Sequence, residues 1–273
     1  MKFRTEISID KAPWQIEPGE RMLLVGSCFA DNIGRRLQQE HFNVTVNPYG
    51  VMYNPASIRH TVERVVRENE DATDEPPRVT LLTLGTNHVY VLNATGEIVD
   101  NCRKQPQSLF TERELTVDEC TDHLTAIVQT LLQWRDDMHI IVTVSPIRYA
   151  KYGYHGSQLS KATLLLAADR LVDACQSMVT YFPAYELLND ELRDYRFYAP
   201  DMLHPSEQAV EYIYERFADT FFSAITHRFI TEWTPLRKAL AHRPQDPDSE
   251  AYRTFMAKTE EDIAAIEAKY HLT

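Results

Sequence analysis

Short apolar runs recur along the chain and are separated by longer stretches with helical spacing. The runs occupy residues 23–25, 79–84, 139–145 and 178–182. Because most of them are continuously apolar, we expect them to be buried on both faces, as parallel strands between two helix layers are. Between the second and third runs, one helix face is marked by Leu124, Ile127, Val128, Leu131 and Leu132. The pattern predicts a three-layer α/β/α sandwich with a mainly parallel central sheet.

Two proline-containing segments interrupt the helical spacing after the first run. Asn47-Pro48-Tyr49-Gly50 and Tyr53-Asn54-Pro55 have the composition of turns. Pro55 also suits the first position of a helix that continues through Ile58 and Val62. We therefore expect a loop between the first two helices.

The C-terminal segment has a different pattern. After Pro244 to Pro247, steps of four and three connect apolar or small residues: Tyr252, Met256, Thr259, Ile263, Ile266 and Tyr270. Such steps mark one face of a helix. We expect a domain over residues 1–240 and a helical extension over 241–273, packed on that domain or on a partner. A homodimer formed through the extension stays an open alternative.

Composition and charge narrow the classes of partner. The chain has 273 residues, 44% of them hydrophobic, which is enough to bury a core. A net charge of -12 disfavours nucleic acid and anionic membrane surfaces as partners. No apolar run approaches the roughly 18 residues of a membrane span, and residues 1–6 lack the apolar segment of a signal peptide. We expect a cytoplasmic protein.

Candidate chemistry begins where the first apolar run ends. Gly26-Ser27-Cys28-Phe29-Ala30 follows Met22 to Val25 and precedes a stretch with helical spacing. A small residue followed by Ser, at the carboxyl end of a strand where a helix begins, can expose a hydroxyl nucleophile. Ser27 is therefore the predicted nucleophile. The neighbouring Cys28 leaves a thiol mechanism open, although a cysteine here is more commonly a small buried apolar residue.

A base for this nucleophile is found near the other end of the chain. Asp201 precedes His204 by three residues in a proline-containing loop. At this spacing the carboxylate can orient the imidazole and stabilise its protonated form. We predict that Asp201 orients His204, and that His204 acts first as base and then as acid.

The pentapeptide at residues 26–30 and the Asp-x-x-His pair resemble the GSCFA family, a branch of the SGNH (GDSL-like) hydrolases. Similar segments continue at residues 143–148, 155–162 and 181–186. The resemblance implies an SGNH/flavodoxin-like fold and a serine ester hydrolase that needs no cofactor. Its implied substrate is a small O-acyl ester, above all an acetyl ester, of a carbohydrate. An O-acyltransferase and an inactive SGNH-like domain that binds a carbohydrate or a protein remain alternatives.

The resemblance also implies an oxyanion hole. In this superfamily the donors are the backbone amides of the nucleophile and of a glycine, together with an Asn side chain. These roles correspond to the amides of Ser27 and Gly50 and to the side chain of Asn87, with Asn54 as a rival. Asn87 departs from the GSCFA pattern, which often reads Gly-Thr-Ala-Trp where this chain reads Gly-Thr-Asn-His.

Three further residues are candidates for substrate binding. Arg148 follows the carboxyl end of a predicted strand, the edge at which open α/β sheets bind ligands; an ion pair with one of the many acids is the alternative role. His155 begins a helix-like stretch, and His88 lies next to Asn87. Gln158 and Lys161 follow His155 at spacings of three, which places them on one side of that stretch, where they could line the rim of the substrate site. For Lys161 the alternative is a solvated charge, the more common role of a lysine on a helix face.

Metal chemistry has little support. The chain has no His-x-His or His-Glu-x-x-His pair, and its four cysteines form no Cys-x-x-Cys motif. A metal site made of Asp201, His204 and His88 is a weaker alternative. We predict no metal and no cofactor. The acyl group and the alcohol of the substrate are not specified by the sequence.

Overall fold

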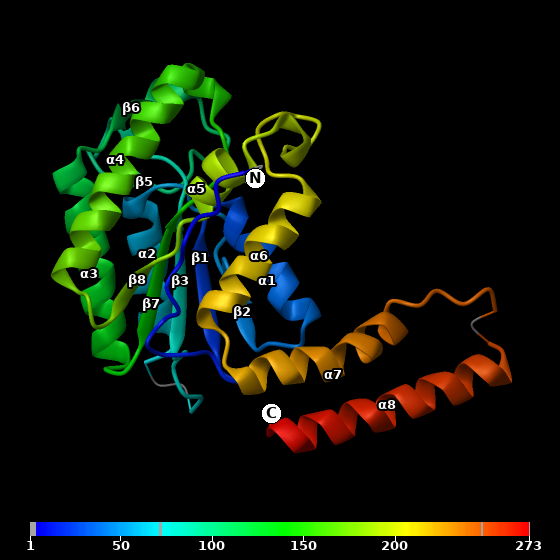
Figure 1. Ribbon diagram of the computed structural model, residues 1–273. Coiled ribbons are helices and arrows are strands. Elements are labelled where there is room, and N and C mark those ends of the chain that lie inside the picture. Colours follow the sequence, from blue (N-terminus) through cyan, green and yellow to red (C-terminus); the bar gives the residue numbers. More distant parts are fainter. Residues whose placement is uncertain (1–3, 71–72, 247, 273) are drawn as a thin grey trace.

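A five-stranded parallel sheet forms the centre of the protein in the computed structural model, which describes residues 4–70, 73–246 and 248–272 (Figure 1). The strand order is β2-β1-β3-β7-β8. The strands are β1 (Met22–Gly26), β2 (Val44–Val46), β3 (Val79–Leu84), β7 (His139–Val144) and β8 (Val179–Tyr181). Each of the four apolar runs is a strand. The three-residue edge strand β2 was not predicted, because it is too short to carry a pattern.

Helices cover both faces of this sheet. One face carries α1 (Cys28–Gln39) and α6 (Glu207–Phe221), and the other carries α2 (Pro55–Glu68), α3 (Val117–Trp134) and α4 (Gly153–Ala174) (Figure 1). Neighbouring residues of β1 point to opposite layers: Leu24 belongs to the core around α1 and α6, whereas Leu23 and Val25 belong to the core around α2 to α4. The predicted three-layer α/β/α sandwich is confirmed.

A small antiparallel sheet follows β3 in the chain. It consists of β4 (His88–Leu92), β5 (Ile98–Val99) and β6 (Phe110–Glu114), in the order β5-β4-β6. These strands are short and partly exposed, and β6 alternates charged or polar residues with few apolar ones, so the sequence pattern did not predict them.

The loop between α1 and α2 contains the two predicted turns. The Gly50 amide donates to the Asn47 carbonyl oxygen over 2.8 Å, and Gly50 has a φ of 93° that favours glycine. Pro55 is the first residue of α2, and the Asn54 side chain caps that helix. The loop carries Tyr53 to the carboxyl end of β3, where the Gly85 amide donates to the Tyr53 carbonyl oxygen over 2.8 Å.

Short helical segments connect the later elements. They are the 3-10 turns Gln107–Leu109, Ala150–Tyr152 and Tyr195–Phe197, the single turn α5 (Ala184–Glu186) and the π-helical segment Leu187–Leu192. The last of the 3-10 turns leads into the loop that contains Asp201 and His204.

Two long helices end the chain. The helices α7 (Ala224–Leu240) and α8 (Glu250–Tyr270) run side by side at the base of the sandwich (Figure 1). The ring of Tyr270 packs edge-on against Phe229 at 5.2 Å, and Ile263 and Ile266 contact the core around α1 and α6. Within the described residues, no helix is long and apolar enough to cross a membrane.

Candidate active site at the carboxyl edge of the sheet

The carboxyl ends of three neighbouring strands meet at one edge of the sheet. Residues 27 and 28 follow β1, residues 85–87 follow β3 and residues 145–149 follow β7. The Arg148 amide donates to the Leu203 carbonyl oxygen over 3.0 Å, which brings the loop of residues 201–204 to the same edge. Parallel pairing therefore gathers segments that are far apart in the sequence.

Asp201 and His204 form the pair that their spacing predicts. The Asp201 Oδ2 atom lies 2.6 Å from Nδ1 of His204, and Oδ1 accepts the amides of Leu203 and His204 over 2.9 and 3.0 Å. These two amides, followed by the imidazole, lower the pKa of Asp201 to about 2. Because Nδ1 faces the carboxylate, Nε2 is the ring nitrogen left to exchange a proton.

The pair lies in a tight and open loop. Met202, between the two residues, has a φ of 59°, a left-handed conformation that side chains rarely adopt. The side chains of Asp201 and His204 are 46% and 45% exposed. The imidazole is therefore accessible to solvent.

Ser27 lies at the predicted turn between β1 and α1, but its hydroxyl is buried. It caps α1, with Oγ accepting the Phe29 amide over 3.3 Å, and this hydroxyl lies 3.0 Å from Oγ1 of Thr83. The residue is 0% exposed. The expectation that the turn exposes the Ser27 hydroxyl is wrong, because the hydroxyl turns inward to cap the helix and contact β3. The Ser27 amide donates to the carbonyl oxygen of Thr83 over 3.0 Å, so it too has a partner.

Gly26 allows the backbone to turn inward between β1 and α1. It has a φ of 144°, and a Cβ atom at this position would lie 2.2 Å from the Thr83 carbonyl oxygen. Only glycine lets β1 approach β3 this closely while the chain turns into α1.

Cys28 is the first residue of α1 and is partly exposed. The charged groups that act on its thiol are Asp31, Lys161 and Asp201. Burial is the largest effect, and it raises the pKa of the thiol to about 11. Cys28 thus lies in the same electrostatic environment as the Asp201–His204 pair.

Lys161 is a functional candidate whose burial the sequence analysis did not predict. It is 2% exposed, and Nζ donates to the carbonyl oxygens of Gly85 and Ser145 over 2.7 and 2.8 Å. The expectation of a solvated charge is wrong. A signal was available, because Lys161 lies one helical turn after Ser157 and three residues before Leu164, within the buried stripe of α4.

Burial of Lys161 has an electrostatic consequence. Removal from water lowers the pKa of its ammonium to about 7, and the Cys28 thiol is the one ionisable group among the described residues that acts against this shift. Its hydrogen-bond partners are carbonyl oxygens, and no ion pair joins it to a carboxylate of the described residues. A group with such a perturbed pKa at a sheet edge is a candidate for function.

The ring of Tyr149 lies beside the Lys161 ammonium. Its hydroxyl oxygen is buried and has no hydrogen-bond partner within the described part of the chain. Burial raises the pKa of Tyr149 well above 10, so the hydroxyl keeps its proton. A Cβ atom at Gly85 would lie 2.5 Å from this hydroxyl, so a glycine is needed at position 85 to leave room for the Tyr149 side chain.

The remaining oxyanion candidates already have structural partners. Asn87 donates from Nδ2 to the Leu115 carbonyl oxygen over 2.7 Å, Gly50 uses its amide in the turn described above, and Asn54 accepts the Ser57 amide over 2.9 Å. Oxyanion binding by these residues stays a prediction.

The three substrate-binding candidates have different surroundings. Arg148 donates from Nη1 to the Met202 carbonyl oxygen over 3.1 Å, and its guanidinium lies over the ring of Tyr154 at 4.3 Å. His155 is exposed on α4. His88 stacks on Tyr152 with the ring centroids 3.5 Å apart. Within the described residues no group of three His, Cys, Asp or Glu side chains could hold a metal, so His88 is not brought to Asp201 and His204.

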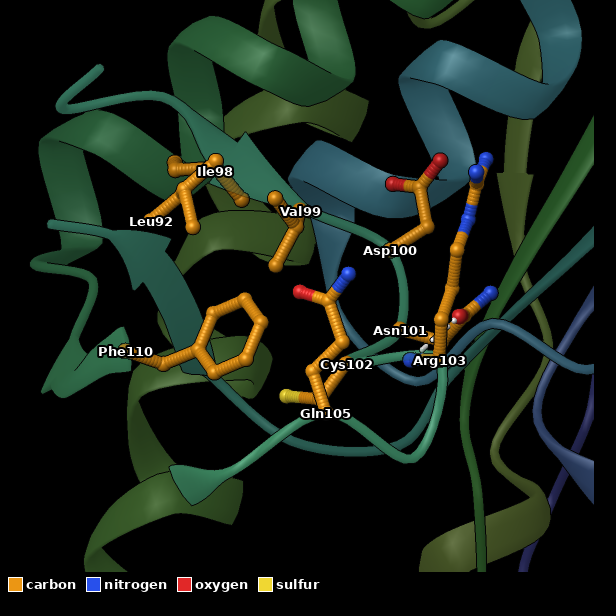
Figure 2. Close-up of a pocket in the computed structure, with 9 residues that line it drawn as sticks. All are labelled: Leu92, Ile98, Val99, Asp100, Asn101, Cys102, Arg103, Gln105 and Phe110. Atoms are coloured by element: carbon orange, nitrogen blue, oxygen red, sulfur yellow. Dashed lines mark hydrogen bonds between the residues drawn. The ribbon is translucent and has the colours of Figure 1, made fainter. Parts of the chain in front are cut away.

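One surface cavity adjoins this edge of the sheet, and another lies away from it. One, of about 290 Å³, adjoins the 201–204 loop and is lined by Arg148, Gln158, Leu188, Asn189, Arg193, Asp194, Tyr195 and Tyr198. The other, of about 370 Å³, lies on the small antiparallel sheet and is lined by residues such as Val99, Cys102 and Phe110 (Figure 2). The second cavity shares no lining residue with the candidate site.

The model of the GSCFA family matches residues 21–76 and 73–217 of this chain, which is more than half of its length. The chain belongs to the GSCFA family. A second model, described as the C-terminal domain of GSCFA domain proteins, matches residues 233–272, which contain α8. No curated protein matches the chain.

Solved structures provide distant matches to this GSCFA protein. A family 3 carbohydrate esterase from Clostridium thermocellum is 13% identical with a TM-score of 0.42, over 82% of this chain and 99% of the other. A carbohydrate esterase of family 3 from Talaromyces cellulolyticus is 11% identical with a TM-score of 0.44, over 78% and 99%. An acetylxylan esterase from Geobacillus stearothermophilus is 14% identical with a TM-score of 0.45, over 77% and 97%.

Proposed function

We propose that this GSCFA protein is an SGNH-type hydrolase of small O-acyl esters. The observation that carries the proposal is the 2.6 Å contact between Asp201 and His204, in a loop bonded to the carboxyl edge of the sheet beside the turn at residues 26–28. A carboxylate that fixes an imidazole next to a nucleophile is the arrangement needed for acyl transfer.

In this mechanism His204 moves the proton. Asp201 holds Nδ1, so Nε2 takes the proton of the attacking group and returns it to the departing alcohol. In the second half, Nε2 takes a proton from the water that releases the acyl group. Asp201 stabilises the imidazolium that is formed in both halves.

The attacking group comes from the turn between β1 and α1. The sequence assigns this role to Ser27, whose hydroxyl would have to leave both the Phe29 amide and Thr83 in order to attack. Cys28, the next residue, is partly exposed without any rearrangement.

The proposed substrate is an acetyl ester of a hydroxyl-rich alcohol such as a sugar. The acetyl group is implied by the SGNH resemblance. The alcohol is supported by the cavity beside the loop, where Tyr195 and Tyr198 offer rings and Arg148 and Gln158 offer donors. Rings combined with a few placed polar groups are a usual lining for such ligands.

The test is hydrolysis of p-nitrophenyl esters of increasing chain length, followed by acetylated oligosaccharides, by wild-type protein and His204→Gln. We expect the acetyl ester to react fastest, and the variant to lose at least about 100-fold in kcat. Wild-type protein that binds an acetylated oligosaccharide without turnover would instead be a binding domain. Acetyl transfer to a sugar hydroxyl in preference to water would make it an acyltransferase.

A further inference from the structure

We propose that the cavity beside the loop of residues 201–204 is a subsite for an acidic sugar, and that Arg148 binds the carboxylate of this sugar. This inference rests on the proposed ester hydrolysis, because it names the class of alcohol that the ester contains. The cavity has a volume of about 290 Å³. Pockets for small ligands usually measure about 300 to 1,000 Å³, so this cavity has room for a single sugar residue.

Arg148 connects the cavity to the catalytic pair. It lines the cavity and donates to two carbonyl oxygens of the loop of residues 201–204. The Arg148 amide donates to Leu203 over 3.0 Å, and Nη1 donates to Met202 over 3.1 Å. A ligand bound to this guanidinium is therefore held next to the loop that contains Asp201 and His204.

The charge of Arg148 has no carboxylate partner among the described residues. Its guanidinium lies over the rings of Tyr154 and Tyr198, at 4.3 and 5.3 Å from their centroids. These rings and the contact with Met202 hold the guanidinium in place, while Nε and Nη2 donate no hydrogen bond within the described part of the chain. A planar fork with two such donors matches a carboxylate, which it binds through two parallel hydrogen bonds.

A second arginine lines the same cavity in a strained conformation. Arg193 has a φ of 27°, in the left-handed region that side chains rarely adopt, at the end of the π-helical segment Leu187–Leu192. Strain of this kind is concentrated at functional sites, where the surrounding structure imposes it. Asp190 lies 3.7 Å from the Arg193 guanidinium, but these side chains are 60% and 79% exposed, so the ion pair is weak. Arg193 can therefore turn to an anionic ligand.

The one carboxylate that lines the cavity is already neutralised. Asp194 accepts the Arg196 amide over 2.9 Å, and its other oxygen lies 3.0 Å from the Arg196 guanidinium. The cavity thus keeps an excess of positive charge in a chain whose net charge is -12, and such a local excess attracts an anion. The rings of Tyr195 and Tyr198 add apolar faces against which a sugar ring can pack. Charge and shape together favour an acidic sugar over a neutral one.

Binding of two matched sugars tests the inference without ester turnover. Methyl glucuronoside and methyl glucoside differ only in a carboxylate, and each is titrated into the protein and followed by NMR. We expect the glucuronoside to bind wild type at least about tenfold more tightly, the value of one charge-assisted hydrogen bond. Arg148→Met should remove this preference, and Arg193→Met, at an exposed position that tolerates substitution, should reduce it. The control is Arg170→Met on α4, which pairs with Asp118 outside the cavity and should retain the preference.

Three binding results overturn the inference. They are equal binding of the two sugars by wild type, binding of neither sugar, and a preference for the glucuronoside that survives in both Arg148→Met and Arg193→Met. The 6-phosphate of methyl glucoside is a further ligand. If it binds and the glucuronoside does not, the anion is a phosphate and the assignment of a carboxylate is wrong.

Hydrolysis of the acetylated forms of the same two sugars connects the subsite to the reaction. We expect kcat/KM of wild type to be at least about tenfold higher for the acetylated glucuronoside, with the difference reduced in Arg193→Met through a higher KM. Equal kcat/KM for the two esters defeats this inference while the proposed function stands. Hydrolysis of neither ester, together with preferred binding of the glucuronoside, defeats the proposed function and supports the acidic-sugar subsite.

Discussion

Nζ of Lys161 lies 2.7 Å from the carbonyl oxygen of Gly85, so a side chain of α4 holds the backbone just after β3. The same atom holds Ser145 just after β7 over 2.8 Å. A buried ammonium thus fixes the ends of two central strands, at the edge where Tyr149 and the Cys28 turn meet. Donating to two carbonyl dipoles is the compensation that a buried cation without a carboxylate requires.

Lys161→Met is expected to change how stability depends on pH. The folded pKa of Lys161 is lowered to about 7, whereas an unfolded lysine titrates near 10.4. Between these values the unfolded chain binds a proton that the folded chain does not, so wild-type stability should rise with pH, by up to about 1.4 kcal/mol per unit. The variant should lack this rise. Urea unfolding at several pH values from 7 to 9 measures it.

The exposed Lys238 of α7 provides the control for this experiment. Lys238→Met should leave the difference from wild type constant over the same pH range. Parallel stability curves for wild type and Lys161→Met would show that the buried ammonium does not titrate in this window.

Asp201→Asn should lower kcat by about 100- to 10,000-fold, because an amide no longer fixes the imidazole in the tautomer that leaves Nε2 free. The matched control is Asp100→Asn. Asp100 is partly exposed and also faces a histidine, with Oδ1 lying 2.8 Å from Nδ1 of His60, but it lies outside the candidate site. Steady-state kinetics on the best p-nitrophenyl ester separates the two variants. Equal losses would indicate a general effect of removing a loop carboxylate.

Ser27→Ala should reduce the free energy of unfolding by about 1 to 2 kcal/mol, since it removes a helix cap and the buried contact between the Ser27 and Thr83 hydroxyls, although the amide of residue 27 still donates to Thr83 Oγ1. Ser223→Ala, which removes the buried cap of α7, is the comparison of similar size. Chemical denaturation gives both values. An unchanged stability in Ser27→Ala alone would mean that the cap on α1 is dispensable.

Gly85→Ala should be strongly destabilising, because the added Cβ would lie 2.5 Å from the Tyr149 hydroxyl and 2.9 Å from the Tyr53 carbonyl oxygen. Gly156→Ala, within α4, has its nearest contact at 3.2 Å and should be tolerated. Thermal unfolding compares the two, and a variant Gly85→Ala as stable as wild type would contradict the close approach of Tyr149.

Single Ala substitutions on α8 should test whether this helix belongs to the same cooperative unit. Tyr270→Ala removes the ring that packs against Phe229, so it should lower the midpoint of thermal unfolding, with a cost of about 3 kcal/mol or less for a partly buried aromatic side chain. Phe255→Ala, at an exposed position of the same helix, is the control. A separate transition for α8 would show that it unfolds by itself.

Much of the fold could be predicted because the central strands are apolar on both faces. The strands at residues 79–84 and 139–145 can be recognised from their own apolar residues alone. The start of α2 can likewise be recognised from Pro55. The strands β4 to β6 were not predicted, because β6 mixes charged with apolar side chains and the apolar residues of β4 and β5 form only short, half-exposed runs.

The sequence by itself determined the three-layer sandwich, the glycine before the α1 turn and the Asp201–His204 contact, since each depends on residues close together in the chain. Tertiary structure alone decided which way Ser27 and Cys28 face, that Lys161 is buried and that Tyr149 reaches Gly85. The physical reason is distance along the chain. The direction of a side chain on a tight turn, and the burial of a charge, depend on Thr83, Gly85 and Ser145, which parallel strand pairing brings from remote parts of the sequence.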